Sequence, residues 1–293
     1  MNRRDFLGKA SAVTAAAMLG KNFAQAEEPH RIQRVGIEAY TIRNLLKEDF
    51  NGTLEKIAAI GYKEIEFGPI DDPKAARATL DRLGMTSPSG AFDYKDMVEK
   101  WPYVSERCHI MGQTYLVIGS IDSALRKQPD GWKRAADSYN HTGKIAKKDG
   151  IQLTYHCHWM EFVPQPDGTI PYDTLIQNTD PNFVQMEMDL GWTNVGGSDP
   201  LKWFAKYPGR FPLVHVKDFT KLPDPKHVYS GHFDGDEVIP DMTAVGHGII
   251  DWPRIFKHAK QAGIKHYYVE HDNPANPMEC ARLSYEYLAK LRF

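Results

Sequence analysis

The sequence predicts an α/β protein in which eight parallel strands alternate with helices and close into a (β/α)8 barrel, or TIM barrel. Two observations predict this fold. Amphipathic segments that end in glycine are followed at once by short β-rich runs, and eight predicted strands alternate with helices along the chain. Alternating strands and helices imply a parallel sheet with right-handed crossovers. One such barrel typically takes about 250 residues, so we expect a single domain over residues 27–293.

Glycines mark the junctions where a predicted helix ends and a strand begins. A glycine at this position can take the left-handed conformation that closes a helix and turns the chain back into the sheet. Such junctions occur at Gly61, Gly84, Gly112, Gly150 and Gly263. The strands predicted after them are 62–67, 85–87, 114–118, 151–156 and 264–270, and further strands are predicted at 35–40, 184–190 and 213–219.

The predicted helices have the expected periodicity and capping residues. Phe50, Leu54 and Ile57 lie on one stripe of a 3.6-residue repeat. Asp199-Pro200 and Asp251-Trp252-Pro253 each place an acidic cap beside a proline that fits the first helical turn. A doubly wound sheet is the competing architecture, but no Gly-x-Gly-x-x-Gly follows a predicted strand. The long irregular stretch 220–245 follows the seventh strand, where barrels place active-site loops.

The first 26 residues have the order of an export signal. Arg3 and Arg4 precede a short, alanine-rich apolar stretch, which is followed by a small-residue cleavage motif at Ala24-Gln25-Ala26. Twin arginines in this position are typical of the Tat route, so we expect a periplasmic protein. An amphipathic anchor is the alternative, although the apolar stretch is shorter than the roughly 20 residues that span a bilayer. We therefore expect no stable membrane insertion.

Charge and cysteine content narrow the classes of partner. The whole chain carries a formal charge of −2, and residues 1–26 contribute four basic and one acidic residue, so removing them leaves −5. An acidic surface argues against nucleic acid as a partner, because phosphate binding needs clustered Lys and Arg. Three scattered cysteines are too few for a disulfide framework or a thiolate metal site. A monomer and a homo-oligomer both remain open.

Ionisable residues gather at the predicted carboxyl ends of the later strands, where barrel active sites are built. They stand at Glu66 in the second strand, His156 and His158 in the fifth, Asp189 in the sixth, His215 and Lys217 in the seventh, and Glu270 and Asp272 in the eighth. Charge at the end of a buried strand is costly unless it is paired or binds metal.

Strand alternation predicts that these groups converge, because side chains two residues apart share a face. Val214 and Val216 would then pack outward while His215 and Lys217 point into the barrel. The same rule turns Asp189 and Glu270 inward. Two carboxylates and one imidazole on three adjacent strands suit a divalent ion.

Each of these residues also has a purely structural interpretation. His215 alone could be a core histidine, Asp189 could cap the next turn, and Glu270 could pair with Lys217. Their combination on consecutive strands favours a metal site over three separate structural roles.

Five segments resemble the xylose isomerase-like barrels, in particular the Tat-exported sugar phosphate isomerases/epimerases. The segments are Tyr155-His156-Cys157-His158-Trp159-Met160-Glu161-Phe162, Asp189-Leu190-Gly191-Trp192, His215-Val216-Lys217-Asp218, Gly246-His247-Gly248-Ile249-Ile250-Asp251-Trp252 and Tyr268-Val269-Glu270-His271-Asp272-Asn273. The resemblance extends over residues 34–293 and is specific for the superfamily rather than for one reaction.

The resemblance implies one divalent metal ion, with Mn, Mg, Zn and Co as the candidates. The family's ligand set carries over to Asp189, His215 and Glu270, with a carboxylate from the fifth strand as the fourth ligand. That strand departs from the family pattern, because its nearest acid is Glu161, three residues beyond His158. Glu161 is therefore the expected fourth ligand, with His158 as the substitute.

The function expected from this resemblance is isomerisation or epimerisation of a sugar or keto-sugar through an enediolate. Expulsion of a β-oxygen from the same site, as by a dehydratase or a keto-glycoside-cleaving lyase, is the first alternative. A non-catalytic carbohydrate-binding barrel is the second. A metal-dependent DNA-repair endonuclease is disfavoured by the acidic charge and the export signal.

The expected roles are as follows. The catalytic residues are Glu270, His158 and Lys217, and the groups that bind a small carbohydrate substrate are Glu66, His156, Trp192 and His247.

Overall fold

The computed structural model describes residues 30–222 and 241–293. The predicted signal at residues 1–26 lies outside these ranges, as does most of the 220–245 stretch. Within the described ranges, no helix is both long and apolar enough to cross a membrane.

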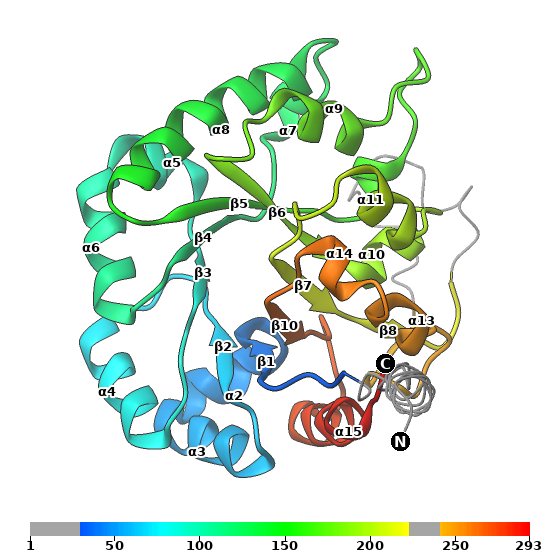
Figure 1. Ribbon diagram of the computed structural model, residues 1–293. Helices are drawn as coiled ribbons and strands as arrows, with labels where there is room; N and C mark the ends of the chain where they lie inside the picture. The colour runs from blue at the N-terminus through cyan, green and yellow to red at the C-terminus, as the bar shows by residue number, and fades with distance from the viewer. Residues whose placement is uncertain (1–29, 223–240) are drawn as a thin grey trace, which may run out of the picture. The chain divides into compact units, whose positions relative to one another are not determined.

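Eight parallel strands form one sheet, as the sequence predicts. They are β1 (Val35–Glu38), β2 (Glu64–Glu66), β3 (Ser89–Ala91), β4 (Tyr115–Ile118), β5 (Gln152–His156), β6 (Val184–Asp189), β7 (Leu213–Val216) and β10 (His266–Val269). Their spatial order is β2-β1-β10-β7-β6-β5-β4-β3. Each strand therefore lies beside its neighbour in sequence, and Figure 1 shows the sheet curved inside a ring of helices.

The two edges of this sheet, β2 and β3, meet through a few backbone hydrogen bonds. Ile65 N donates to Thr86 O at 3.0 Å, and Ala91 N donates to Phe67 O at 2.8 Å. These contacts form isolated parallel bridges rather than a full ladder. The barrel is thus nearly closed, and the carboxyl ends of all its strands face one rim.

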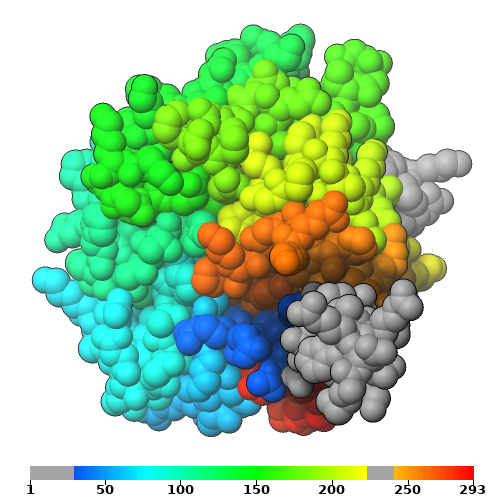
Figure 2. Space-filling view, viewed as in Figure 1, coloured from blue at the N-terminus to red at the C-terminus, as the bar shows by residue number. Residues whose placement is uncertain are grey.

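Helices cover the outer face of the barrel. They are α2 (Arg43–Glu48), α3 (Phe50–Ile60), α4 (Pro73–Leu83), α5 (Tyr94–Glu99), α6 (Trp101–Met111), α7 (Ser123–Arg126), α8 (Gly131–Lys148), α9 (Pro171–Asn178), α10 (Leu190–Val195), α11 (Pro200–Lys206), α13 (Trp252–Phe256), α14 (Ala259–Ala262) and α15 (Pro277–Lys290), with the 3-10 turns η1 (Ala39–Ile42) and η2 (Met160–Phe162). In Figure 2 the chain passes around this face in sequence order, from blue through green to orange.

The sequence signals for helix ends are confirmed. Gly61, at the end of α3, has a φ of 126° that other residues rarely adopt, and its N–H bonds to carbonyls of the last turn. Asp199 caps α11 by accepting from Leu201 N, and Asp251 caps α13 by accepting from Arg254 N. Leu54 and Ile57 are buried on the inner stripe of α3.

The third strand differs from the prediction of 85–87, because β3 begins at Ser89. Pro88 has no N–H to donate to a ladder, which interrupts strand pairing at that point. Its carbonyl instead accepts from Thr114 N at 2.9 Å and Tyr115 N at 3.1 Å. Thr86 keeps only the isolated bridge to Glu64.

Beyond β7 the chain forms a small ribbon near the rim. The strands β8 (Asp218–Phe219) and β9 (Met242–Thr243) pair antiparallel. The buried carboxylate of Asp218 accepts from Gly246 N at 2.9 Å and from Trp252 Nε1 at 2.9 Å. This side chain therefore fixes the path of the segment that leads from the ribbon to α13.

Candidate metal centre

Asp189 is the last residue of β6, and its two carboxylate oxygens do different things. Oδ1 accepts from Trp192 N at 2.7 Å and so caps α10. Oδ2 is buried and has no hydrogen-bond partner within the described residues, although Lys217 Nζ lies 3.2 Å away. The structural role expected for Asp189, a cap on the next turn, is confirmed, and its second oxygen is left beside the other polar groups of the site. Burial is the main reason that its pKa is raised to about 6.

His215, on β7, lies at the centre of the buried polar groups. Its Nδ1 is 2.8 Å from Glu270 Oε2, and its Nε2 is 3.0 Å from Glu66 Oε1. Burial alone would lower its pKa, but the charges of Glu187 and Glu270 outweigh burial and hold it well above the usual value. Without a metal, His215 is thus a cation among acids.

His156, at the end of β5, has the opposite electrostatics. Its ring centroid is 4.4 Å from that of His215, and its Nδ1 lies 3.1 Å from Glu187 Oε2. Burial and then the charge of His215 lower its pKa to about 3. His156 is therefore a neutral imidazole, which is the form that binds metal.

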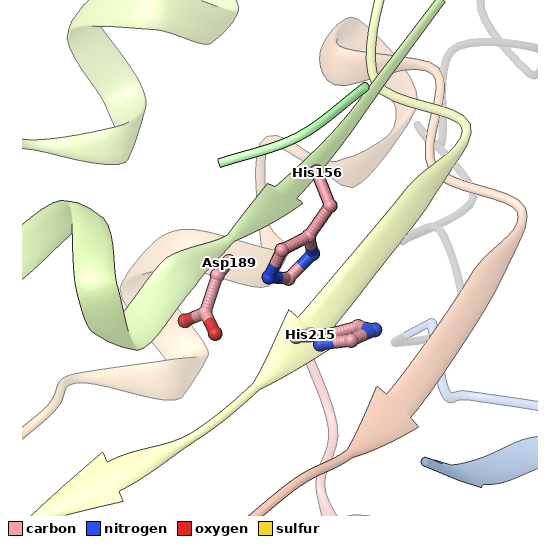
Figure 3. A group of neighbouring side chains, drawn as sticks. All are labelled: His156, Asp189 and His215. Atoms are coloured by element: carbon pink, nitrogen blue, oxygen red, sulfur yellow. The ribbon is translucent and has the colours of Figure 1, made fainter. Parts of the chain in front are cut away.

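Donor atoms of His156, Asp189 and His215 all lie within 4.8 Å of one another, and the three residues are buried. Figure 3 shows them beside one another at the ends of adjacent strands. Glu187 Oε1 is a second buried oxygen without a hydrogen-bond partner in the described chain. Two imidazoles, a carboxylate and oxygens that lack donors are a set that fits a divalent cation.

Lys217 follows β7 and contacts Asp189, and its side chain is almost completely buried. Its Nζ is 2.6 Å from Asp272 Oδ1 and 3.0 Å from Glu270 Oε2. Burial alone would lower its pKa, but the surrounding carboxylates raise it above the usual value. The ammonium also lies 4.9 Å from the centroid of the Trp192 ring. Lys217 is therefore a fixed, charged donor at the rim.

Glu38 and Glu66 bring two further carboxylates from β1 and β2. Donor atoms of Glu38, Glu66 and His215 form a second group within 4.8 Å. Ser89 Oγ donates to Glu66 and lies 2.8 Å from the Tyr268 hydroxyl oxygen. Burial, followed by the neighbouring Glu66, raises the pKa of Glu38.

The structure does not bring Glu161 together with these groups. Its carboxylate accepts from the Tyr155 hydroxyl at 2.7 Å and from His158 N at 2.9 Å. Tyr155 stacks on Tyr139 of α8, outside the barrel. The alternation of β5 turns His156 inward and Tyr155 outward, and Glu161 is bonded to the outward residue. His156, expected to bind substrate, lies where Glu161 was expected to serve as a ligand.

The remaining predicted residues divide into two places. The ring of His158 lies 4.8 Å from His156 and 6.4 Å from Trp192, which places both at the rim. His247 instead lines a separate cavity of about 510 Å³ against α15, together with Gly246 and Tyr287. None of the other predicted site residues lines that cavity.

Two residues of the centre, Glu187 and Glu38, were not assigned a role from the sequence. Glu187 stands two positions before Asp189, so strand alternation turns it inward as well. Glu38 follows the buried, outward-packed Ile37 in the same way. Strand alternation places both glutamates on the inner face. A single inward glutamate in a strand does not by itself indicate a metal site, so neither was assigned a role.

Fold and site together define a class: a β/α barrel enzyme with a metal-binding set of side chains at its catalytic rim. The chain belongs to the xylose isomerase-like TIM barrel family, whose model matches residues 54–291.

Relatives of known name support this assignment. An inosose dehydratase of Lacticaseibacillus casei is 27% identical over 266 residues, which cover 82% of this chain and 88% of the relative. A crystal structure of a sugar phosphate isomerase/epimerase from Parabacteroides distasonis is 26% identical, with a TM-score of 0.72, and covers 92% of this chain and 96% of that one. A xylose isomerase-like barrel from Mycobacterium smegmatis, in complex with magnesium, shares the fold at 16% identity and a TM-score of 0.60, covering 90% and 96% of the two chains.

Proposed function

We propose that this chain is a divalent-metal-dependent enzyme that removes the proton beside the carbonyl of a keto-sugar or keto-polyol and then expels the β-oxygen. The observation that carries the proposal is the buried group of His156, Asp189 and His215, whose donor atoms lie within 4.8 Å of one another. Beside it, Glu187 Oε1 is buried and has no hydrogen-bond donor among the described residues. A buried carboxylate oxygen without a donor costs about 1–3 kcal/mol or more, and a bound cation removes that cost.

His156, Asp189 and His215 would hold the ion, and Glu270, which contacts His215, is the expected further ligand or base. A divalent ion bound there would polarise the substrate carbonyl and acidify the neighbouring C–H bond. Two imidazole nitrogens favour Co or Zn over Mg and Mn, which prefer oxygen ligands.

The protein's own groups would carry the proton and the developing charge. The Lys217 ammonium, held by Asp272 and Glu270, would donate a hydrogen bond to the substrate oxygen that becomes negative. His158, at the rim beside His156, would accept the proton from carbon and return it to the departing oxygen. The C–H electron pair forms the new C=C bond, the C–O bond breaks, and the oxygen leaves as water or an alcohol.

Similarity to inosose dehydratases over most of the chain favours elimination. Isomerisation or epimerisation, the reaction expected from the sequence, is the second candidate. It shares the first proton removal, and the likeness to the sugar phosphate isomerase/epimerase structure supports it. A non-catalytic carbohydrate-binding barrel is the remaining alternative.

One experiment separates these functions. Mature protein loaded with Mn, Co or Zn is incubated with an inosose, and with a keto-hexose in parallel, and products are analysed by NMR and mass spectrometry. Loss of one water identifies elimination, a product of unchanged mass identifies isomerisation or epimerisation, and sugar binding without turnover identifies a binding protein. Asp189→Asn is the matched inactive variant, because it keeps the side-chain size and removes the charge.

We also propose that residues 1–26 direct export by the Tat route to the periplasm. The support is the order of Arg3, Arg4, the apolar stretch and the Ala24-Gln25-Ala26 motif. Replacing both arginines by lysine keeps the charge and should retain the precursor in the cytoplasm. Unchanged export of that variant would contradict the proposal.

A further inference from the structure

A cavity of about 640 Å³ lies at the carboxyl ends of β1 and β2, under helices α2, α3 and α4. This volume is within the range of cavities that hold small ligands, roughly 300–1,000 Å³. None of the proposed metal ligands lines it, so it is distinct from the metal centre. It nevertheless borders the centre on two sides.

The inner border is Glu38, which lines the cavity and also belongs to the group with Glu66 and His215. Its Oε1 accepts weakly from Tyr40 N at 3.3 Å. Its Oε2 is buried and finds no donor among the described residues, and the residue as a whole is only 9% exposed. A buried acceptor without a donor at the junction of two spaces is suited to a ligand hydroxyl.

The outer border is Arg43. Its Nη1 donates to Tyr40 O and to Asp272 O, each at 2.7 Å, and its guanidinium lies 3.9 Å from the centroid of the Tyr40 ring. The Asp272 carboxylate in turn holds Lys217 at 2.6 Å. One arginine thus connects the mouth of the cavity to the charged groups of the rim.

The wall between these borders is mostly apolar. It is formed by Ala39, Leu46, Phe50, Phe67, Pro69, Ile70 and Ala76. The rings of Phe50 and Phe67 stack with centroids 5.9 Å apart and an interplanar angle of 24°. Two aromatic rings among aliphatic side chains make the wall apolar, which favours an apolar or aromatic ligand group.

The charges around the cavity argue against a phosphate group. Asp71 and Asp72 line it together with Arg43 and Lys47, so acids balance bases, and a third acid, Glu38, lies at its inner border. The N-terminus of α4 could otherwise attract an anion, but Asp72 already caps it by accepting from Ala75 N at 2.9 Å. An uncharged ligand group is therefore expected.

We propose that this cavity is a subsite for an uncharged apolar or aromatic substituent on the substrate, with Glu38 accepting a hydrogen bond from a hydroxyl at the junction. The substrate class is then a keto-sugar that carries such a group as a glycoside, rather than a free sugar or a sugar phosphate. This inference rests on the proposed function only for the keto group of the substrate. The cavity and its lining residues do not depend on a bound metal.

The test measures binding by calorimetry with phenyl β-glucoside, methyl β-glucoside and glucose 1-phosphate as probes, with and without added Mn. We expect phenyl glucoside to bind at least about 10-fold more tightly than methyl glucoside, since a phenyl ring buries far more apolar area. Ala75→Trp, which fills the cavity from α4, should abolish this preference, whereas Ala78→Trp, exposed on the same helix and not lining the cavity, should keep it. Glu38→Gln should weaken both glucosides.

Equal binding of the two glucosides to the wild type would overturn the subsite, as would tighter binding of glucose 1-phosphate. So would a phenyl preference that survives in Ala75→Trp. Failure of the proposed function gives a different result. The protein would then neither bind metal nor turn over an inosose or keto-hexose, but metal-free protein would still prefer the phenyl glucoside.

Discussion

The Glu187 carboxylate lies 3.1 Å from Nδ1 of His156, and this contact sets how the histidine presents its other nitrogen. A carboxylate on one ring nitrogen fixes the tautomer and orientation of a metal-binding imidazole. Glu187 and His156 come from adjacent strands whose paired positions are the last of the β5–β6 register. The donor set therefore depends on a residue that need not itself contact the metal.

Glu187→Gln should weaken metal binding by about 10- to 100-fold, the range for loss of such a supporting contact. The amide keeps the size of the side chain but removes the charge that orients His156. Affinity is measured by competition with a chelating dye. Glu55→Gln, a substitution at an exposed ion pair with Arg82, is the control and should bind metal as the wild type does. Wild-type affinity in Glu187→Gln would contradict this role.

Replacing Glu161 and Asp189 by their amides should have opposite effects on metal binding. Asp189→Asn should abolish metal binding, whereas Glu161→Gln should keep it, because Glu161 contacts Tyr155 and His158 N instead. Glu161→Gln should lower the free energy of unfolding by about 1–3 kcal/mol, the cost of disturbing a buried hydrogen-bonded group. Metal content is measured by mass spectrometry, and the free energy of unfolding by denaturant titration. Loss of metal from Glu161→Gln would restore the ligand role predicted from the sequence.

Asp218→Asn should destabilise the fold by about 2–4 kcal/mol. The carboxylate accepts from Phe219 N at 2.9 Å and Gly246 N at 2.9 Å, besides Gly248 N, Ile250 N and Trp252 Nε1. An amide group replaces one acceptor by a donor that faces other donors. Hydrogen exchange should rise in residues 246–250, with exposed Asp241→Asn as the control. Unchanged exchange there would show that the segment does not depend on Asp218.

The ion pair between Asp173 and Lys206 should make stability depend on pH. Burial alone would raise the pKa of Asp173, but hydrogen bonds from Lys206, at 2.7 and 2.8 Å, and from Tyr207 outweigh it and lower the pKa. A carboxyl with a depressed folded-state pKa stabilises the fold above its unfolded-state pKa, and this stabilisation is lost as pH falls through the folded-state value. Asp173→Asn should therefore lower the melting temperature near neutral pH.

The gap between Asp173→Asn and the wild type should narrow as the pH falls below the usual carboxyl range, about pH 4. Because the side chain of Lys206 is 45% exposed, solvent screens the pair, and we expect an effect of about 1 kcal/mol or less. Differential scanning calorimetry across this pH range is the measurement. A gap that widens on acidification would contradict the sign of the linkage.

The sequence by itself determined the barrel and most of its rim. Glycine junctions, Asp caps and alternation along each strand are local properties, so the inward direction of His215, Asp189 and Glu270 follows from the order of residues alone. Alternation also turns Glu187 inward, because it shares a face of β6 with Asp189.

Only the tertiary structure decided which strand-5 residue joins the donor set. Glu161 lies in the 3-10 turn η2, where strand alternation no longer predicts direction, and its buried bond to Tyr155 turns it away from the centre. His247 likewise lies in a segment whose path Asp218 fixes through bonds to Gly246 N and Gly248 N, and such long-range hydrogen bonds leave no local pattern in the sequence. The cavity beside Glu38 exists only because α2, α3 and α4 pack around the ends of β1 and β2.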